Sequence, residues 1–125
     1  MKGKKKRNDL LLSASDIEAI LCALPLVSYG ITDTVEQAAA NTRHSISASD
    51  KLSNGILSLT PEEYWVIYLA VASALDILEG VDVDYLEGLP LDQPWQDELR
   101  KNFFAYNRLF LFFERAVNPQ PDRNA

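Results

Sequence analysis

The sequence has few of the residues on which active sites and covalent frameworks depend. Its 125 residues include one cysteine, Cys22, and one histidine, His44. A single cysteine excludes an internal disulfide framework, and a single histidine excludes most metal and acid–base constellations. Five isolated glycines cannot form a glycine-rich phosphate loop. We therefore expect no catalytic residues, no cofactor and no metal ion, with Cys22 buried and His44 solvated.

Basic residues are rare outside the N-terminus. The chain has 12 basic and 18 acidic residues, and five of the basic residues lie in the first seven positions. The rest of the chain therefore has 7 basic and 18 acidic residues, a net charge of −11. Those five are Lys2, Lys4, Lys5, Lys6 and Arg7. A body this acidic repels phosphate groups, so we expect no direct binding of nucleic acid by the folded domain.

Long hydrophobic runs are also missing. Only three leucines (10–12) follow the basic segment, and the longest apolar stretch (64–78) contains Ser73 and Asp76 and is shorter than the ~20 residues that span a bilayer. The sequence therefore predicts a soluble, cytoplasmic chain without membrane insertion. We expect a disordered basic tail over 1–9, one helical domain over 10–117 and a disordered tail over 118–125.

The first half of the domain predicts two helices. Ser15-x-x-Glu18 is typical of a capping box, and the helix behind it is expected to kink at Pro25 and to end at Gly30, in the left-handed conformation. Asp33-x-x-Glu36 can cap a second helix, whose apolar and small residues recur at helical spacing until Asn54-Gly55. Its serines and threonine favour helix weakly, so one helix to about Ser53 and two pieces broken near His44 are both open.

The second half has stronger helix signals. Thr60-Pro61-Glu62-Glu63 combines a cap hydroxyl, a proline at the first helical position and a box glutamate, and Gly80 is the expected stop. Asp92-Gln93-Pro94 begins a helix expected to run from about Pro94 to Val117. The segment 81–85 alternates too briefly to predict a strand. These signals predict an all-α, four-helix bundle-like single domain.

The two halves resemble one another weakly. Ser13-x-Ser15-x-x-Glu18 aligns with Ser58-x-Thr60-x-x-Glu63 at an offset of 45 residues. Two duplicated helical hairpins would give this pattern, and so would independent capping. The join formed by Lys51-Leu-Ser-Asn-Gly55 and Leu59-Thr-Pro-Glu-Glu63 resembles one common in small bacterial and phage helical proteins, which implies no activity.

The last two predicted helices carry more apolar surface than a small bundle needs. At 100° per residue, positions 109–113 alone place apolar side chains around the whole circle. Three explanations compete: burial at the centre under loops, a homodimer, and a groove for a partner helix or an apolar ligand. The candidate interface residues are Phe103, Phe104, Tyr106, Phe110, Phe113, Trp65 and Tyr68.

Acidic residues dominate a stretch without opposing charge. No Lys or Arg occurs between Leu52 and Leu99, where ten carboxylates lie. We expect five of them to cluster around the end of the third helix: Asp76, Glu79, Asp82, Asp84 and Glu87. Such a face would suit a decoy that occupies a basic nucleic-acid-binding surface of another protein, whereas the simpler interpretation is that acidity keeps an apolar domain soluble.

Together these patterns predict a non-catalytic helical module for protein–protein interaction that self-associates through aromatic helix faces. The alternatives are the acidic decoy and a helical pocket for an apolar ligand. In all three a protein partner or small ligand, rather than a reaction, defines the function.

Overall fold

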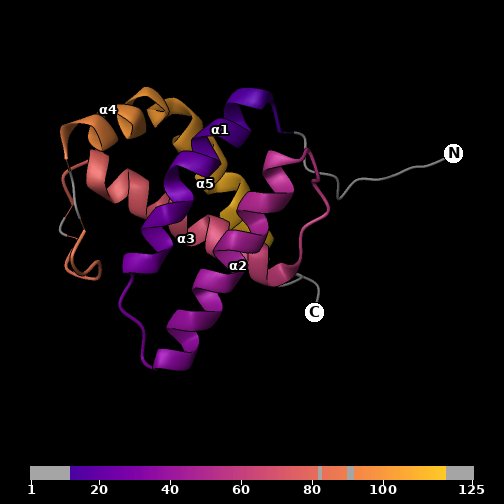
Figure 1. Cartoon of the computed structure of the whole chain (residues 1–125). Helices are drawn as coiled ribbons and strands as arrows, with labels where there is room; N and C mark the ends of the chain where they lie inside the picture. Colours follow the sequence, from indigo (N-terminus) through magenta and orange to yellow (C-terminus); the bar gives the residue numbers. More distant parts are fainter. Residues whose placement is uncertain (1–11, 82, 90–91, 118–125) are drawn as a thin grey trace, which may run out of the picture.

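The computed structural model describes residues 12–81, 83–89 and 92–117, which fold into a bundle of helices (Figure 1). The elements are α1 (Ala14–Ala23), the 3₁₀ helix η2 (Leu24–Tyr29), α2 (Val35–Ser53), α3 (Pro61–Leu78), α4 (Gln93–Lys101) and α5 (Phe103–Val117). The described residues include no β-strand, and one isolated bridge pairs Gly30 with Leu86. The all-α, bundle-like prediction is confirmed, while the predicted tails lie outside the described residues.

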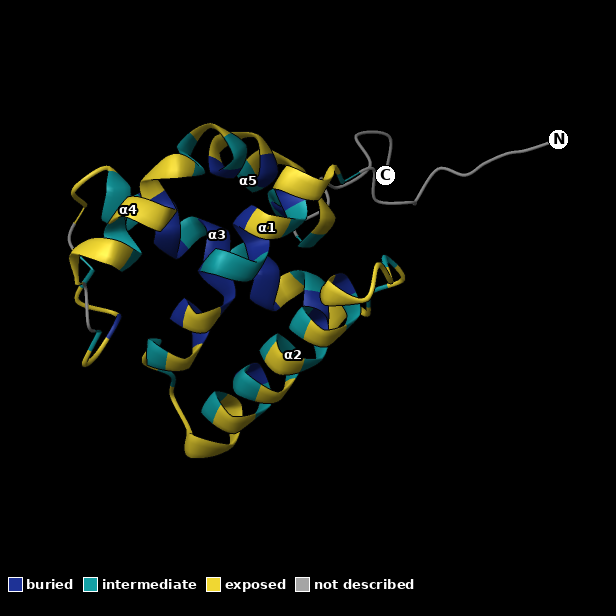
Figure 2. Cartoon of the chain, turned by 45° about the horizontal axis from the view of Figure 1, so that its top comes forward, coloured by how far each residue is buried: buried dark blue, intermediate teal, exposed yellow. Residues whose placement is uncertain are grey.

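Helix α3 is the central element of the bundle. All the other helices, α1, η2, α2, α4 and α5, pack against it. Its fully buried residues Val66, Ile67, Ala70, Val71 and Ala74 join residues of the surrounding helices in one hydrophobic core. Figure 2 shows α3 in the interior of the bundle, whereas α2 crosses the front with exposed residues on its outer side.

Two of the four predicted helix caps are confirmed, and the other two lie one or two residues from the predicted positions. Thr60 caps α3 in a capping box with Glu63, and the Asp92 side chain caps α4. The cap of α1 is Ser13, whose partner is Asp16, rather than the predicted pair two residues later. The two capping boxes are therefore 47 residues apart (60 − 13), so the predicted alignment of the halves at 45 does not superimpose their caps.

In the first half of the domain, the structure differs from the prediction at the end of the first helix and at the start of the second. The α-helix ends at Ala23 and tightens into η2, because Pro25 has no N–H to donate to the α-helical ladder. Gly30 follows η2 with φ −69, an ordinary extended conformation and not the left-handed one expected. Helix α2 is a single helix, and its cap is Thr34 rather than Asp33.

The predicted helix from Pro94 to Val117 is two helices. Asn102 separates them: its backbone N–H bonds to Leu99 O at 3.0 Å, and its side-chain amide donates to Glu98 O at 2.9 Å. Its own carbonyl then accepts from Tyr106 N, so that a single residue separates α4 from α5. Asparagine suits such a break because its side chain competes for backbone hydrogen bonds.

Candidate functional site

Helix α5 has two apolar faces with different environments. Its inner face carries Tyr106, Leu109 and Phe113, all buried against α1 and α3. The Tyr106 hydroxyl donates to Ala19 O of α1 at 2.8 Å, and burial raises the pKa of Tyr106. The Phe113 ring lies 5.8 Å from that of Tyr64 on α3. The inner face is therefore an anchor to the core.

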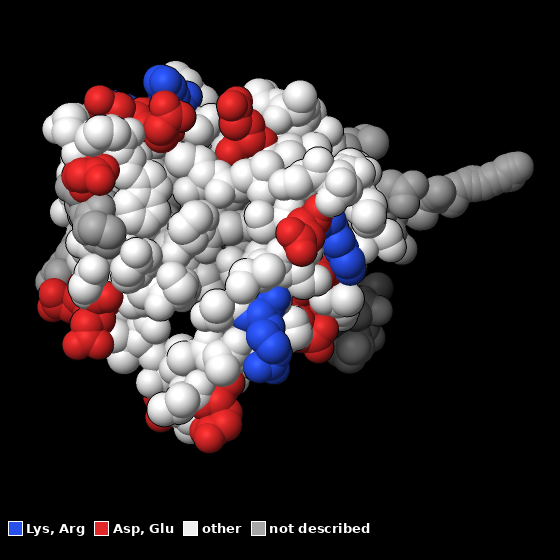
Figure 3. Space-filling model, viewed as in Figure 1, with Lys and Arg blue, Asp and Glu red and all other residues white. Residues whose placement is uncertain are grey.

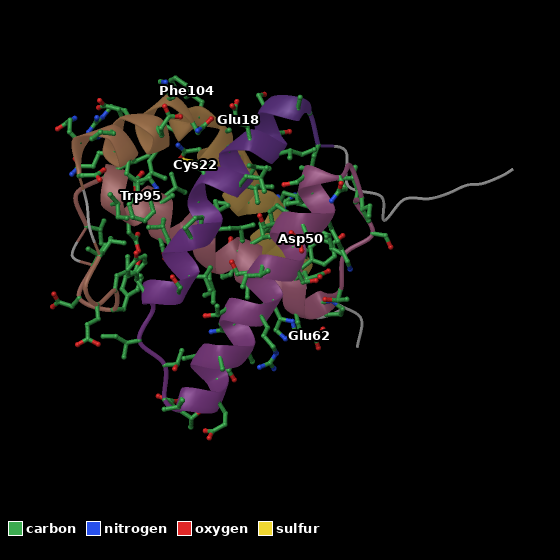
Figure 4. All side chains as sticks on the ribbon, in the orientation of Figure 1. Glu18, Cys22, Asp50, Glu62, Trp95 and Phe104 are labelled. Carbon is green, nitrogen blue, oxygen red and sulfur yellow. The ribbon has the colours of Figure 1, made fainter. Side chains whose placement is uncertain are left out.

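The outer face of α5 presents large apolar side chains to solvent. Phe104 is 85% exposed, Leu111 57% and Phe112 43%. At 100° per residue these three residues lie within about 100° of one another, on the side of the helix opposite Phe113. Figure 4 shows Phe104 at the outer edge of the molecule, pointing away from the other labelled side chains. We call Phe104, Leu111 and Phe112 the outer face.

The structure divides the seven predicted interface residues into three groups. Tyr106 and Phe113 are fully buried, so the prediction that they form an interface is wrong: they are used within the fold. Trp65, Tyr68 and Phe110 form a row across α3 and α5, with ring centroids 5.7 and 5.5 Å apart. Phe103 is half-buried beside Phe104.

Leu111 and Phe112 are exposed apolar residues that the sequence analysis did not select. Polar Asn107, Arg108 and Arg115 share their side of α5. In an otherwise apolar helix, the positions of the polar residues mark the outward direction. That signal identifies Phe104 and Leu111, which lie at helical spacing from Arg108 and Arg115.

Two arginines lie on the same side of α5 as the outer face, Arg108 between Phe104 and Phe112 and Arg115 beyond them, and they differ in their surroundings. The Arg108 guanidinium binds the buried carboxylate of Asp16 with both of its terminal nitrogens, Nη1 at 3.2 Å from Oδ2. Burial alone would raise the pKa of Asp16. The hydrogen bonds from Arg108 and from the Ser13 backbone lower it by more, so the net shift of the pKa is downward. Arg115 is exposed and has no ion-pair partner among the described residues.

The predicted acidic face is described except for Asp82, which lies outside the described residues. Asp76 accepts a hydrogen bond from the Tyr85 hydroxyl, which helps to hold the loop after α3 against that helix. Glu79, Asp84 and Glu87 are exposed. Figure 3 shows carboxylates over several elements in separate groups around a broad uncharged region on the face in view. Clustering of the five residues remains a prediction.

Cys22 and His44 lie on different helices and are both half-buried. Burial raises the pKa of the Cys22 thiol, which keeps it protonated, and the Trp95 indole N–H donates to the Cys22 carbonyl at 3.5 Å (Figure 4). Neither residue faces a group that would activate it as a nucleophile or a base in the contacts described. Within the described ranges, no three His, Cys, Asp or Glu side chains come together as metal ligands.

None of the helices in the described part of the chain is long and apolar enough to cross a membrane. Comparisons of the chain with protein-family models, with curated protein sequences and with solved structures found no match.

Proposed function

We propose that this chain is a non-catalytic helical module that pairs with a second copy of itself through the outer face of α5. The observation that carries the proposal is the exposure of Phe104, Leu111 and Phe112 on one side of one helix. Large apolar side chains exposed together on one side of a helix are typical of protein–protein interfaces. Aromatic residues and arginine, which flank one another here, are enriched at such interfaces.

A second copy suits this face because the apolar residues are distributed symmetrically along the helix. Phe104 lies four residues before Arg108, and Phe112 lies four residues after it. A two-fold axis passing near Arg108 would set two α5 helices antiparallel, with Phe104 of each copy against Leu111 and Phe112 of the other. Both copies then use the same patch, as a two-fold interface requires.

Charge is compatible with the same arrangement. Arg108 would lie near the axis, where its charge is already compensated by Asp16. Arg115 would lie seven residues from the axis, opposite the end of α4 in the second copy. That end carries Arg100 and Lys101, whose charges are balanced by Asp97 and Glu98 in the surface ion pairs of the single chain. Arg115 would join this exposed network, which contributes specificity more than affinity.

The size of the face indicates the strength of the association. A helix of 15 residues is about 22 Å long at 1.5 Å per residue. A pair of such helices buries less than the ~1,600 Å² of a standard interface, so we expect association in the micromolar range.

Replacing Phe104 with Asp tests the proposal. The wild-type chain is expected to reach about twice its 14.0 kDa mass at micromolar concentrations in sedimentation or light scattering. Phe104→Asp should give a folded monomer, because the new charge is fully solvated in the monomer but would be buried without a partner in the dimer. The fold should survive, since Phe104 contributes little to the core.

Val35→Asp is the matched control, because Val35 is also an exposed apolar residue, 81% exposed, and lies at the start of α2. It should leave the mass unchanged. A wild-type chain that stays at 14.0 kDa at every concentration contradicts self-association, and equal loss of mass in both variants contradicts the assignment to α5.

A further inference from the structure

A pocket of about 390 Å³ lies between α2 and the start of α3. Its lining comes from two helices and combines amide, imidazole, carboxylate and aromatic groups: Gln37, Ala40, Asn41, His44, Pro61, Glu62 and Trp65. Figure 4 places Glu62 beside α2, on the opposite side of the view from Phe104. The pocket is therefore a different surface from the outer face of α5.

Asn41 is the most deeply buried residue of this lining, 7% exposed. Its Oδ1 accepts a hydrogen bond from Gln37 Nε2 at 2.9 Å. Its Nδ2 carries two N–H donors, and no described residue accepts from either of them. Buried polar groups are nearly always paired, and an unpaired donor in a pocket wall indicates a missing acceptor. The acceptor that fits a side-chain amide donor is a carbonyl oxygen.

The mouth of the pocket offers groups for a cation. Trp65 is 41% exposed, and one side of its ring already contacts Tyr68. The Glu62 carboxylate is exposed and has no hydrogen-bond or ion-pair partner among the described residues. Tryptophan gives the strongest cation–π attraction of the aromatic residues, and a carboxylate beside it adds a charge-assisted hydrogen bond.

We propose that this pocket binds an arginine side chain of an extended peptide segment in a basic partner protein. The guanidinium stacks on the Trp65 indole and bonds to the Glu62 carboxylate. A carbonyl of the peptide backbone accepts from Asn41 Nδ2. Arginine fits better than lysine, because its planar group stacks on a ring and donates to a carboxylate at the same time.

The charge of the chain favours a basic partner over an anionic ligand. The pocket lining contains one carboxylate, Glu62, and no Lys or Arg, and the chain as a whole has a formal net charge of −6. This field attracts a cationic peptide and repels the phosphates of a nucleotide, another planar ligand of similar size. The proposal is independent of self-association through α5, because the pocket and the outer face share no residue.

A titration monitored by amide NMR tests the pocket directly. The probe is acetyl-Gly-Gly-Arg-Gly-Gly-amide, added to the full chain. We expect saturable shifts of the Trp65 indole N–H and the Asn41 side-chain N–H signals. The same peptide with citrulline in place of arginine keeps the shape and loses the charge, and we expect it to bind at least about fivefold more weakly.

Two variants assign the binding to the named groups. Glu62→Gln should weaken binding of the arginine peptide to the level of the citrulline peptide, and Trp65→Leu should abolish it. Glu18→Gln is the matched control: it is an exposed carboxylate on α1, far from Glu62 in Figure 4, and should change nothing. The absence of saturable shifts, equal binding of both peptides or equal effects of the Glu62 and Glu18 variants would overturn the proposal. None of these results bears on the mass measured for the Phe104 variant.

Discussion

α3 and α5 are both apolar around most of their circumference, but the bundle uses them differently. α3 packs against every other helix, and its buried residues cover several sides. α5 packs mainly against α3 and α1, and its far side keeps Phe104, Leu111 and Phe112 exposed. A helix with apolar residues on most sides can therefore either lie at the centre of the bundle or expose an apolar surface that a partner could cover. The number of helices that pack against it decides between the two.

Side-chain size explains which helix became central. α3 has small buried residues, Ala70, Ser73 and Ala74, which allow neighbouring helices to approach from several directions. α5 has bulky residues on both faces, and it packs closely only on the side that meets α3 and α1. Within the described residues, the expectation of burial at the centre therefore holds for α3 and not for α5, whose far side is exposed.

The largest effect should come from truncating the inner face of α5. Phe113→Ala removes a fully buried ring and should lower the free energy of unfolding by about 3–5 kcal/mol, from lost burial and the cavity that remains. Phe104→Ala on the outer face should change it by less than about 0.5 kcal/mol in the monomer. Urea denaturation, carried out at a protein concentration too low for self-association, measures the free energy of unfolding of both variants. Similar costs for the two variants would mean that α5 has no distinct faces.

The sequence predicted the start of a helix well where only one pair of residues could form its N-terminal capping box. Thr60 with Glu63 has no competitor nearby, and the structure has that cap. Ser13 with Asp16 and Ser15 with Glu18 satisfy the same capping pattern, so local sequence cannot choose between them. The choice is made by Arg108, 92 positions away, which binds the carboxylate of Asp16. A contact at that separation has no local signature.

The candidate site was predictable only in part for a related reason. The apolar surplus of α5 was evident in sequence, and its polar residues mark the outward side, but which apolar side chains are fully buried depends on how α1 and α3 meet the helix. Tyr106 illustrates the limit, since its buried hydroxyl bond to Ala19 O fixes the inner side and joins residues 87 positions apart. The pocket beside Asn41 was not predictable at all, because α2 and the start of α3 form it only when packed.

Acid should weaken the two ion pairs that hold α3 and α5 to their neighbours. Burial raises the pKa of Glu63, but hydrogen bonds from Ser47, the Thr60 backbone and Lys51 outweigh it and lower the pKa to about 2. The pKa of Asp16 is also lowered, through Arg108. A carboxylate with a lowered pKa stabilises the fold above its unfolded pKa, and that stability is lost as pH falls through the folded pKa.

The melting temperature should therefore decline from about pH 4.5 towards about pH 2, where Glu63 takes up its proton. Glu63→Gln should be less stable than wild type at pH 7 and should show a shallower acid decline. Asp16→Asn should show the same pattern to a smaller extent, because the Arg108 partner is largely exposed. Thermal melts followed by circular dichroism across this pH range measure both, and parallel declines in all three proteins would contradict the role of these carboxylates.

The smallest effect should be that of salt on self-association, and it separates the outer face of α5 from the acidic surface. Raising the salt concentration from 0.1 to 1 M shortens the Debye length from ~10 to ~3 Å, which screens exposed charges but leaves apolar burial intact. We expect the dissociation constant, measured by sedimentation, to change by less than about twofold, since the exposed pairs near Arg115 contribute little. Charge reversal at Glu79 and Glu87, two exposed members of the predicted acidic face, should leave it equally unchanged. A steep loss of association in salt, reproduced by those reversals, would instead favour the acidic decoy, because electrostatic attraction to a basic surface is the part of binding that salt removes.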